Sequence, residues 1–168
     1  MVLTRLGNKK GIADKLYQYF PPHKLRITPF FGAGGAFFNT PRAKYNVIND
    51  LDDDVTNLYL VISTQTEELI DAVTTMPISS SLLRHWQDNI PADPVLKAAR
   101  FLLISNFSYL GKGNTIKYGV GNEKENLIPR IKETYLSLGD TRIMNVDFRE
   151  VIPKISFYPT VVKREESF

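Results

Sequence analysis

The sequence contains no cysteine and only two histidines, His23 and His85. The absence of cysteine excludes disulfide bonds, thiolate metal sites and cysteine nucleophiles, and two histidines are too few for a multi-histidine metal site. No apolar run approaches the roughly 18 residues that a membrane-spanning helix needs, and the N-terminus has no signal-peptide core. The sequence therefore predicts a soluble, cytoplasmic protein without a metal or a membrane partner.

Basic and acidic residues are nearly equal in number. The 168 residues include 21 basic and 18 acidic side chains, which gives a formal charge of +3. This balance is compatible with nucleic-acid binding and equally with an ordinary, mildly basic surface. Four aspartates nevertheless form a compact cluster at positions 50, 52, 53 and 54. At 43% hydrophobic residues, the chain is long enough for one well-buried domain and short for two.

Apolar spacing and the positions of glycine and proline predict an α/β protein. The expected order opens with helix 10–20, strand 25–31, a glycine turn with a short helix to 39, strand 44–49 and helix 55–63. It continues with helices 67–76, 80–89 and 94–105, the last with Asp93 as its N-cap and Pro94 as its first residue. A polar loop or hairpin over 107–121, helix 126–138 and strand 141–146 follow. The opening order is that of a doubly wound sheet, and the three consecutive helices indicate an insertion beside it.

The most informative segment is the turn from Phe31 to Gly35, which has three glycines in four positions. Glycine permits backbone angles closed to other residues and lets a ligand approach the main chain. At a strand-to-helix turn, this arrangement is typical of a nucleotide-like site, although tight loops have the same composition.

Carboxylates follow two of the predicted strands. Asp50 ends the second strand about 20 residues after the glycines, where an acceptor for a ribose diol is expected. Asp147 ends the third strand beside Phe148, and together they could accept from a purine amine and stack on its ring. Each aspartate has an alternative role as a cap of the following helix, and Asp52 or Asp53 could also cap the helix that starts near residue 55.

These segments resemble the Dam-like, D12 class of adenine-specific DNA methyltransferases. The resemblance rests, in order, on residues 5–9, 29–35, 48–50 with 57–59, 106–111 and 145–148. It implies an incomplete Rossmann-like methyltransferase sheet with a helical target-recognition insertion, S-adenosylmethionine as cofactor and double-stranded DNA as partner. The implied cofactor-binding residues are Lys9, Pro29, Phe30, Gly32, Gly34, Asp50, Asp147 and Phe148. The implied DNA-binding residues are Tyr109, Lys112, Asn114, Lys117 and Tyr118.

The resemblance also suggests a division of the chain into three parts. Residues 1–66 would hold the N-terminal motif and the cofactor-binding α/β part. Residues 67–138 would form the helical insertion with its DNA-recognition loop. Residues 139–168 would return to the sheet and form a tail.

Two positions depart from the family pattern. Thr28 replaces the carboxylate that usually precedes the Pro-Phe of the glycine loop. The catalytic motif Asp/Asn-Pro-Pro-Tyr/Phe is absent, and the double proline Pro21-Pro22 lies in another context. We therefore assign no catalytic residue and expect the chain to need a complementing polypeptide that carries the motif, although a gene fragment would have the same sequence. A catalytically inactive DNA- or cofactor-binding regulator or decoy, and an unrelated nucleotide-binding α/β protein, are the alternatives.

Overall fold

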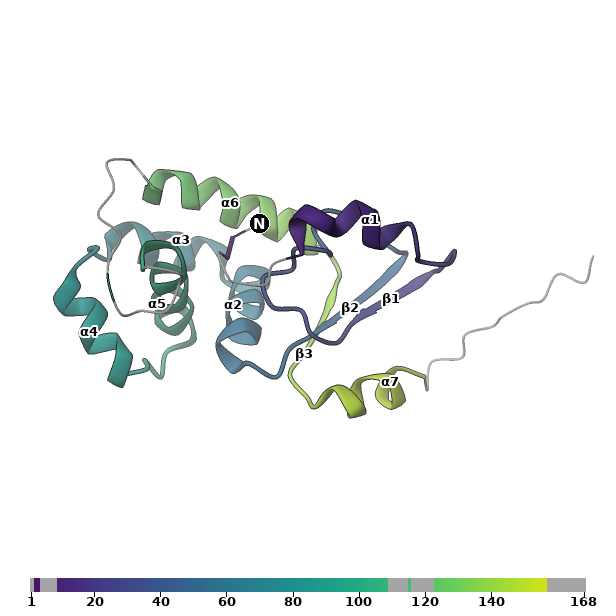
Figure 1. Ribbon diagram of the computed structural model, residues 1–168. Helices are drawn as coiled ribbons and strands as arrows, with labels where there is room; N and C mark the ends of the chain where they lie inside the picture. The colour runs from purple at the N-terminus through teal and green to yellow at the C-terminus, as the bar shows by residue number, and fades with distance from the viewer. Residues whose placement is uncertain (1, 4–8, 109–114, 116–122, 157–168) are drawn as a thin grey trace, which may run out of the picture.

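The computed structural model describes residues 2–3, 9–108, 115 and 123–156. At one end of the molecule lies a parallel sheet of three strands in the order β1-β2-β3 (Figure 1). The strands are β1 (Leu25–Thr28), β2 (Tyr45–Asn49) and β3 (Arg142–Met144). Ile27 lies opposite Val47, which lies opposite Arg142 on the other side. Because all three strands are parallel, their carboxyl ends meet at one edge of the sheet.

The helices follow the predicted order closely. The short η1 (Lys10–Ile12) and α1 (Ala13–Tyr17) precede the sheet, and α7 (Phe148–Ser156) follows β3. Between β2 and β3 lie α2 (Asp53–Thr64), α3 (Thr66–Thr75), α4 (Ser80–Asp88), α5 (Pro94–Phe107) and α6 (Glu123–Leu138).

Side-chain caps set the starts of two of these helices. Asp52 accepts a hydrogen bond from the backbone N–H of Asp54 at 3.1 Å, and Asp93 accepts one from Leu96 at 2.8 Å. Pro94 occupies the first turn of α5, where its missing N–H costs nothing. The capping roles predicted for Asp52 and Asp93 are therefore confirmed.

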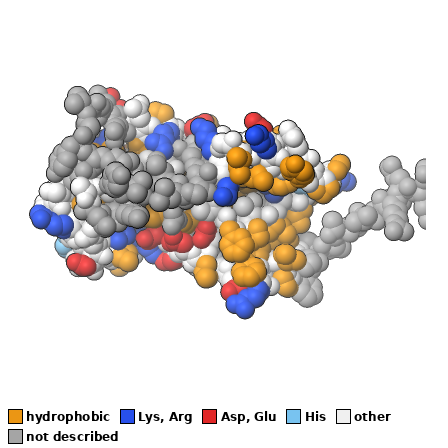
Figure 2. Space-filling view, in the orientation of Figure 1, with side chains coloured by type: hydrophobic (Ala, Val, Ile, Leu, Met, Phe, Trp, Pro, Cys, Tyr) orange, Lys and Arg blue, Asp and Glu red, His pale blue; other side chains and the backbone are white. Residues whose placement is uncertain are grey.

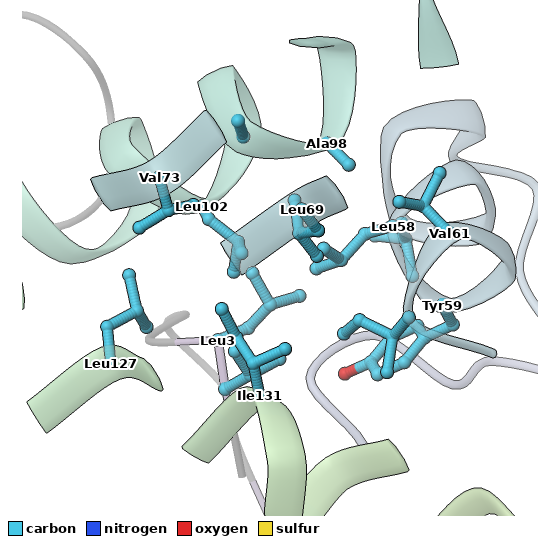
Figure 3. Packing of buried hydrophobic residues seen from close by; sticks show 14 of the residues in the cluster. Leu3, Leu58, Tyr59, Val61, Leu69, Val73, Ala98, Leu102, Leu127 and Ile131 are labelled. Atoms are coloured by element: carbon cyan, nitrogen blue, oxygen red, sulfur yellow. The ribbon is translucent and has the colours of Figure 1, made fainter. Parts of the chain in front are cut away.

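One hydrophobic cluster joins α2, α3, α5 and α6 (Figure 3). Leu58, Leu69, Leu102 and Ile131, one from each helix, are all fully buried there. The predicted insertion is thus packed on the helix that follows β2 and shares its core. Four rings, Phe31, Phe37, Phe38 and Tyr59, extend this cluster toward the sheet, with centroids 4.7 to 6.1 Å apart.

Two aspartates of the acidic cluster, Asp53 and Asp54 at the start of α2, form ion pairs with basic residues of α5. Lys97 forms ion pairs with Asp53 and Asp54, and Arg100 lies 3.3 Å from Asp54. The guanidinium of Arg100 also donates twice to the carbonyl of Trp86, at 2.9 and 2.6 Å. The cluster therefore ties α2, α4 and α5 together.

The short helix predicted to end near residue 39 is wrong, because the segment forms successive turns instead. Gly32 and Gly34 have φ of 54° and 70°, which no right-handed helix contains. Farther along, the side chains of Asn39 and Thr40 donate to the carbonyls of Gly35 and Ala36, at 2.8 and 2.7 Å. These side chains occupy carbonyl groups that a helix would pair with backbone N–H groups.

Other predicted boundaries shift by a few residues. β1 ends at Thr28, before the predicted limit at 31, and β3 ends at Met144, before the predicted limit at 146. Phe107, predicted to open a loop, is the last residue of α5 and is buried. The rest of the predicted 107–121 loop lies outside the described residues, apart from Ser108 and Thr115. The fold class is α/β, as predicted, with a small parallel sheet.

Candidate functional site

The segments that follow the three strands come together at the carboxyl edge of the sheet. The glycine turn follows β1, Asp50 follows β2, and the segment 145–148 follows β3. In open α/β sheets, ligands bind outside this edge. The structure therefore brings the glycine turn, Asp50, Asp147 and Phe148 to the position at which a ligand of such a sheet is expected.

Asp50 holds the glycine turn against the end of β2. One carboxylate oxygen, Oδ2, accepts from the backbone N–H of Gly32 at 2.6 Å. The other, Oδ1, accepts from the N–H of Asp52 at 3.0 Å. A carboxylate has about four lone-pair sites, so each oxygen keeps capacity for a further donor.

Gly32 and Gly34 are required for different reasons. Both have positive φ, but a Cβ on Gly32 would meet nothing within 4 Å. A Cβ on Gly34 would lie 2.4 Å from Cε2 of Phe38 and 2.8 Å from Cζ of Phe31. Gly34 therefore permits close packing inside the protein, whereas Gly32 leaves open space beside the main chain.

The backbone of Asp50 is fixed from two directions. Its carbonyl accepts from the hydroxyl of Thr56 in α2 at 3.0 Å and from the amide of Asn145 at 2.8 Å. Sequence reasoning gave no role to Thr56, and it included Asn49 and Asn145 only as members of the segments 48–50 and 145–148, without a role of their own. The available signal was a polar side chain in or beside a buried strand, as at Asn49, which is only 1% exposed.

Asp147 caps α7 and pairs with Arg149. Its Oδ1 accepts from the backbone N–H and from Nε of Arg149, at 2.9 and 2.8 Å, and its Oδ2 accepts from Nη2 at 2.9 Å. These hydrogen bonds hold the pKa of Asp147 well below its usual range and raise the pKa of Arg149. The alternative capping role is thus confirmed, and the carboxylate stays ionised at neutral pH.

Two exposed aromatic rings flank this edge. Phe30 is 73% exposed and Phe148 is 47% exposed, yet their ring centroids lie 5.2 Å apart at an angle of 42°. The Arg149 guanidinium lies 5.8 Å from the centroid of the Phe148 ring. Figure 2 shows hydrophobic side chains gathered on the half of the molecule that carries the sheet and α7. Exposed rings at a ligand-binding edge offer a surface on which a planar group can stack.

Lys9 is exposed and directly precedes η1. Its place beside the methionine part of the cofactor stays a prediction. Its neighbour Lys10 lines a polar cavity of about 350 Å³ with Phe38, Asn39 and residues of α6. Neither Asp50 nor Asp147 lines this cavity, so it is separate from the edge of the sheet.

The predicted DNA-binding residues lie outside the part of the chain that the structure describes. They are Tyr109, Lys112, Asn114, Lys117 and Tyr118. Within the described part, no helix is long and apolar enough to span a membrane. The same part contains no group of three or more histidine, aspartate or glutamate side chains suited to a metal ion.

Comparison with known proteins agrees with this geometry. Residues 6–88, which include the glycine turn and Asp50, match the profile of the D12 class N6 adenine-specific DNA methyltransferases. Over these residues the chain is similar to that methyltransferase class. It is 27% identical over 136 residues to a DNA adenine methylase from Serratia marcescens, covering 77% of this chain and 48% of that protein. It is 34% identical over 64 residues to a DNA N-6-adenine-methyltransferase from Escherichia phage P1, covering 38% and 8%.

The predicted resemblance is thereby confirmed. The chain spans about half the length of the Serratia methylase. The family match ends at residue 88 and does not include Asp147 and Phe148. The parallel pairing of β3 with β2 brings these two residues to the same edge of the sheet as Asp50.

Proposed function

We infer that this chain forms the cofactor-binding and DNA-recognition part of an S-adenosylmethionine-dependent adenine-N6 DNA methyltransferase. The hydrogen bond between Gly32 N–H and Asp50 Oδ2 carries this proposal, because it joins the glycine turn and the strand-end carboxylate into one site. Adenine-specific DNA methyltransferases as a class generally use S-adenosylmethionine. The parts 1–66, 67–138 and 139–168 would then supply cofactor contacts, DNA recognition and the returning strand of a Rossmann-like sheet.

The residues at the strand ends suit this cofactor. The open space at Gly32 admits a ligand against the main chain, and Asp50 retains acceptor capacity for the two hydroxyls of a ribose. Phe30 and Phe148 expose rings on which adenine can stack, and Asp147 lies beside them as an ionised acceptor. Pro29 and Gly34 shape the turn, and Lys9 would bind the carboxylate of the methionine part.

The cofactor supplies an electrophilic methyl group on a sulfonium sulfur. Asp50 and Phe148 would orient it, so that the adenine amine attacks in line with the departing sulfur. N6 would gain the methyl group as the sulfur–methyl bond breaks, S-adenosylhomocysteine would leave with the bonding electron pair, and the proton of N6 would pass to solvent, so that no metal is needed. The 168 residues contain no Asp/Asn-Pro-Pro-Tyr/Phe motif to accept hydrogen bonds from that amine. We therefore propose that residues other than these 168, on the same or on a complementing polypeptide, provide this motif.

DNA contacts are assigned to the segment after α5. Lys112 and Lys117 would neutralise phosphates, Tyr109 and Tyr118 would stack on bases, and Asn114 would read base edges. A test is salt-dependent binding to duplex DNA. Replacing both lysines with glutamine is expected to weaken binding and to reduce its salt dependence.

The cofactor proposal is tested by calorimetric titration with S-adenosylmethionine. D50N is expected to weaken binding by about tenfold or more, because its NH2 group would face the donor N–H of Gly32 or of Asp52. D88N, which changes an exposed aspartate at the end of α4, is the matched control and should bind as the wild type does. Absence of binding by the wild-type chain, or equal affinities of D50N and wild type, would contradict the proposal.

Methyl transfer to adenine-containing duplex DNA separates the active assembly from the second candidate, an inactive regulator or decoy. The missing motif is the observation that favours this second candidate. Transfer that depends on both this chain and a polypeptide carrying the motif supports the split enzyme. Cofactor or DNA binding without transfer in that mixture supports the regulator.

A further inference from the structure

Asn49 is a buried amide at the centre of the carboxyl edge. It is the last residue of the middle strand β2 and is only 1% exposed. Its Nδ2 donates to the carbonyl of Pro29 and to the carbonyl of Val146, both at 3.0 Å. Its Oδ1 accepts from the N–H of Val146 at 3.1 Å. The amide orientation follows from these partners, because both carbonyls can only accept.

The Asn49 side chain continues the sheet beyond its last paired residues. β2 pairs with β3 as far as Asn49 and Met144. Beyond this point, the side-chain amide exchanges two hydrogen bonds with Val146, as a facing peptide group would. Toward β1, the Asn49 backbone carbonyl accepts from Phe31 N–H at 2.9 Å, and Nδ2 reaches Pro29. One residue thus joins the segments after β1 and β3.

We propose that Asn49 is a positioning residue that sets the separation between the two walls of the cofactor site. One wall is the Pro29–Phe30 segment, and the other is the Asp147–Phe148 segment, which directly follows Val146. This inference rests on the proposed function, since the walls are those assigned to the cofactor's adenosine. Asn49 does not itself touch the ligand. It acts by fixing the positions of the segments that carry Phe30 and Phe148, whose rings contact each other and form one exposed surface.

Other side chains cannot replace this amide. Alanine would leave two carbonyls and one N–H without the partner that this 1% exposed side chain provides. Aspartate has the same shape, but its ionised oxygens would face the carbonyls of Pro29 and Val146. Only a protonated aspartate could donate to one of them while accepting from Val146 N–H.

The experiment compares N49A and N49D with N46A in titrations with S-adenosylmethionine. Asn46 is a matched control, because it lies on the same strand, is 6% exposed and donates to the Ala43 carbonyl at the other end of the sheet. N49A is expected to weaken binding by about tenfold or more after correction for the folded fraction. N46A should bind within about twofold of wild type after the same correction.

The pH profile of N49D separates positioning from general destabilisation. Burial between carbonyls, with the carboxylates of Asp50 and Asp147 nearby and Arg149 opposing them, raises the pKa of the introduced carboxyl group. The affinity of N49D for S-adenosylmethionine, relative to wild type, should therefore increase as the pH is lowered from about 7.5 to about 5.5. The relative affinity of N49A should not change over this range. Equal losses in N49A and N46A, or a flat N49D ratio, would overturn the inference.

Amide hydrogen exchange keeps this test distinct from the cofactor proposal. In N49A, exchange at Phe31 and Val146 should accelerate by about tenfold or more relative to N46A at equal global stability. If wild type fails to bind S-adenosylmethionine, the proposed function fails. In that case, accelerated exchange at Phe31 and Val146 would still support Asn49 as a positioning residue, and unchanged exchange would overturn this role.

Discussion

Replacing Gly34 with alanine tests the packing of the glycine turn against the core. The new Cβ would lie 2.4 and 2.7 Å from two atoms of the Phe38 ring and 2.8 Å from Cζ of Phe31. Neither ring can move freely, because both pack against Phe37 and Tyr59. The substitution therefore combines a backbone penalty with a steric one.

The two penalties are separable in magnitude. A left-handed φ costs a non-glycine residue about 1–2 kcal/mol, and this applies at φ 70°. Forcing an extra methyl group into a packed site costs about 1–3 kcal/mol more. We expect G34A to lose about 2–5 kcal/mol of the free energy of unfolding. Because small domains have about 5–15 kcal/mol in total, this loss is large but measurable.

Two other glycines provide matched controls. Gly32 has a φ of 54°, but a Cβ there meets nothing within 4 Å, so G32A should show the backbone penalty alone, about 1–2 kcal/mol. Gly11 has neither a positive φ nor a close neighbour, and G11A should be neutral or stabilising by about 0.4–1 kcal/mol.

The assay is urea unfolding at constant temperature, followed by circular dichroism with the m value checked for each variant. The order G11A, then G32A, then G34A, from most to least stable, is the expected result. A G34A variant as stable as G32A would show that the Phe31 and Phe38 rings do not pack against the turn, and the reasoning would fail.

Three further predictions concern single contacts. R149Q should raise the pKa of Asp147 toward its ordinary value, as measured by NMR titration. In the wild type the pKa of this carboxylate is lower in the folded than in the unfolded chain. The carboxylate therefore stabilises the fold above about pH 4, and this stabilisation is lost as the pH falls. R42K should lose about 1–2 kcal/mol in urea unfolding, because Arg42 donates to the carbonyls of Ser137 and Leu138 at the end of α6, and lysine cannot reproduce this fork. D93A should cost about 1 kcal/mol in the same measurement through loss of the α5 cap.

Local signals in the sequence were sufficient for most of the elements. The predicted 94–105 helix, with Asp93 as cap and Pro94 in the first turn, corresponds to α5. The predicted strand 44–49 corresponds to β2. Such features depend on residues a few positions apart, so hydrophobic spacing and cap preferences encode them directly.

The turn after β1 was predicted less well for a physical reason. An apolar run after glycines favours a helix by composition, but Asn39 and Thr40 compete for carbonyls that the helix would need. The positive φ of Gly32 and Gly34 also keeps these two residues out of any right-handed helix. The presence of glycine in the sequence shows that a positive φ is permitted at these positions. It does not show that the folded chain adopts one.

The candidate site was predicted as separate strand ends, and the contacts between those ends could not be read from the sequence. Asn145 donates to the Asp50 carbonyl across 95 positions, and Asn49 donates to Val146 across 97. The intervening residues include all of α2 to α6, so no local pattern links the partners. The parallel pairing of β2 with β3 brings them within reach, and the amides then fix their spacing. The strand ends are therefore held by Thr56 of α2 and by the amides of Asn49 and Asn145, and we expect loss of the Asn49 amide to let the two walls separate.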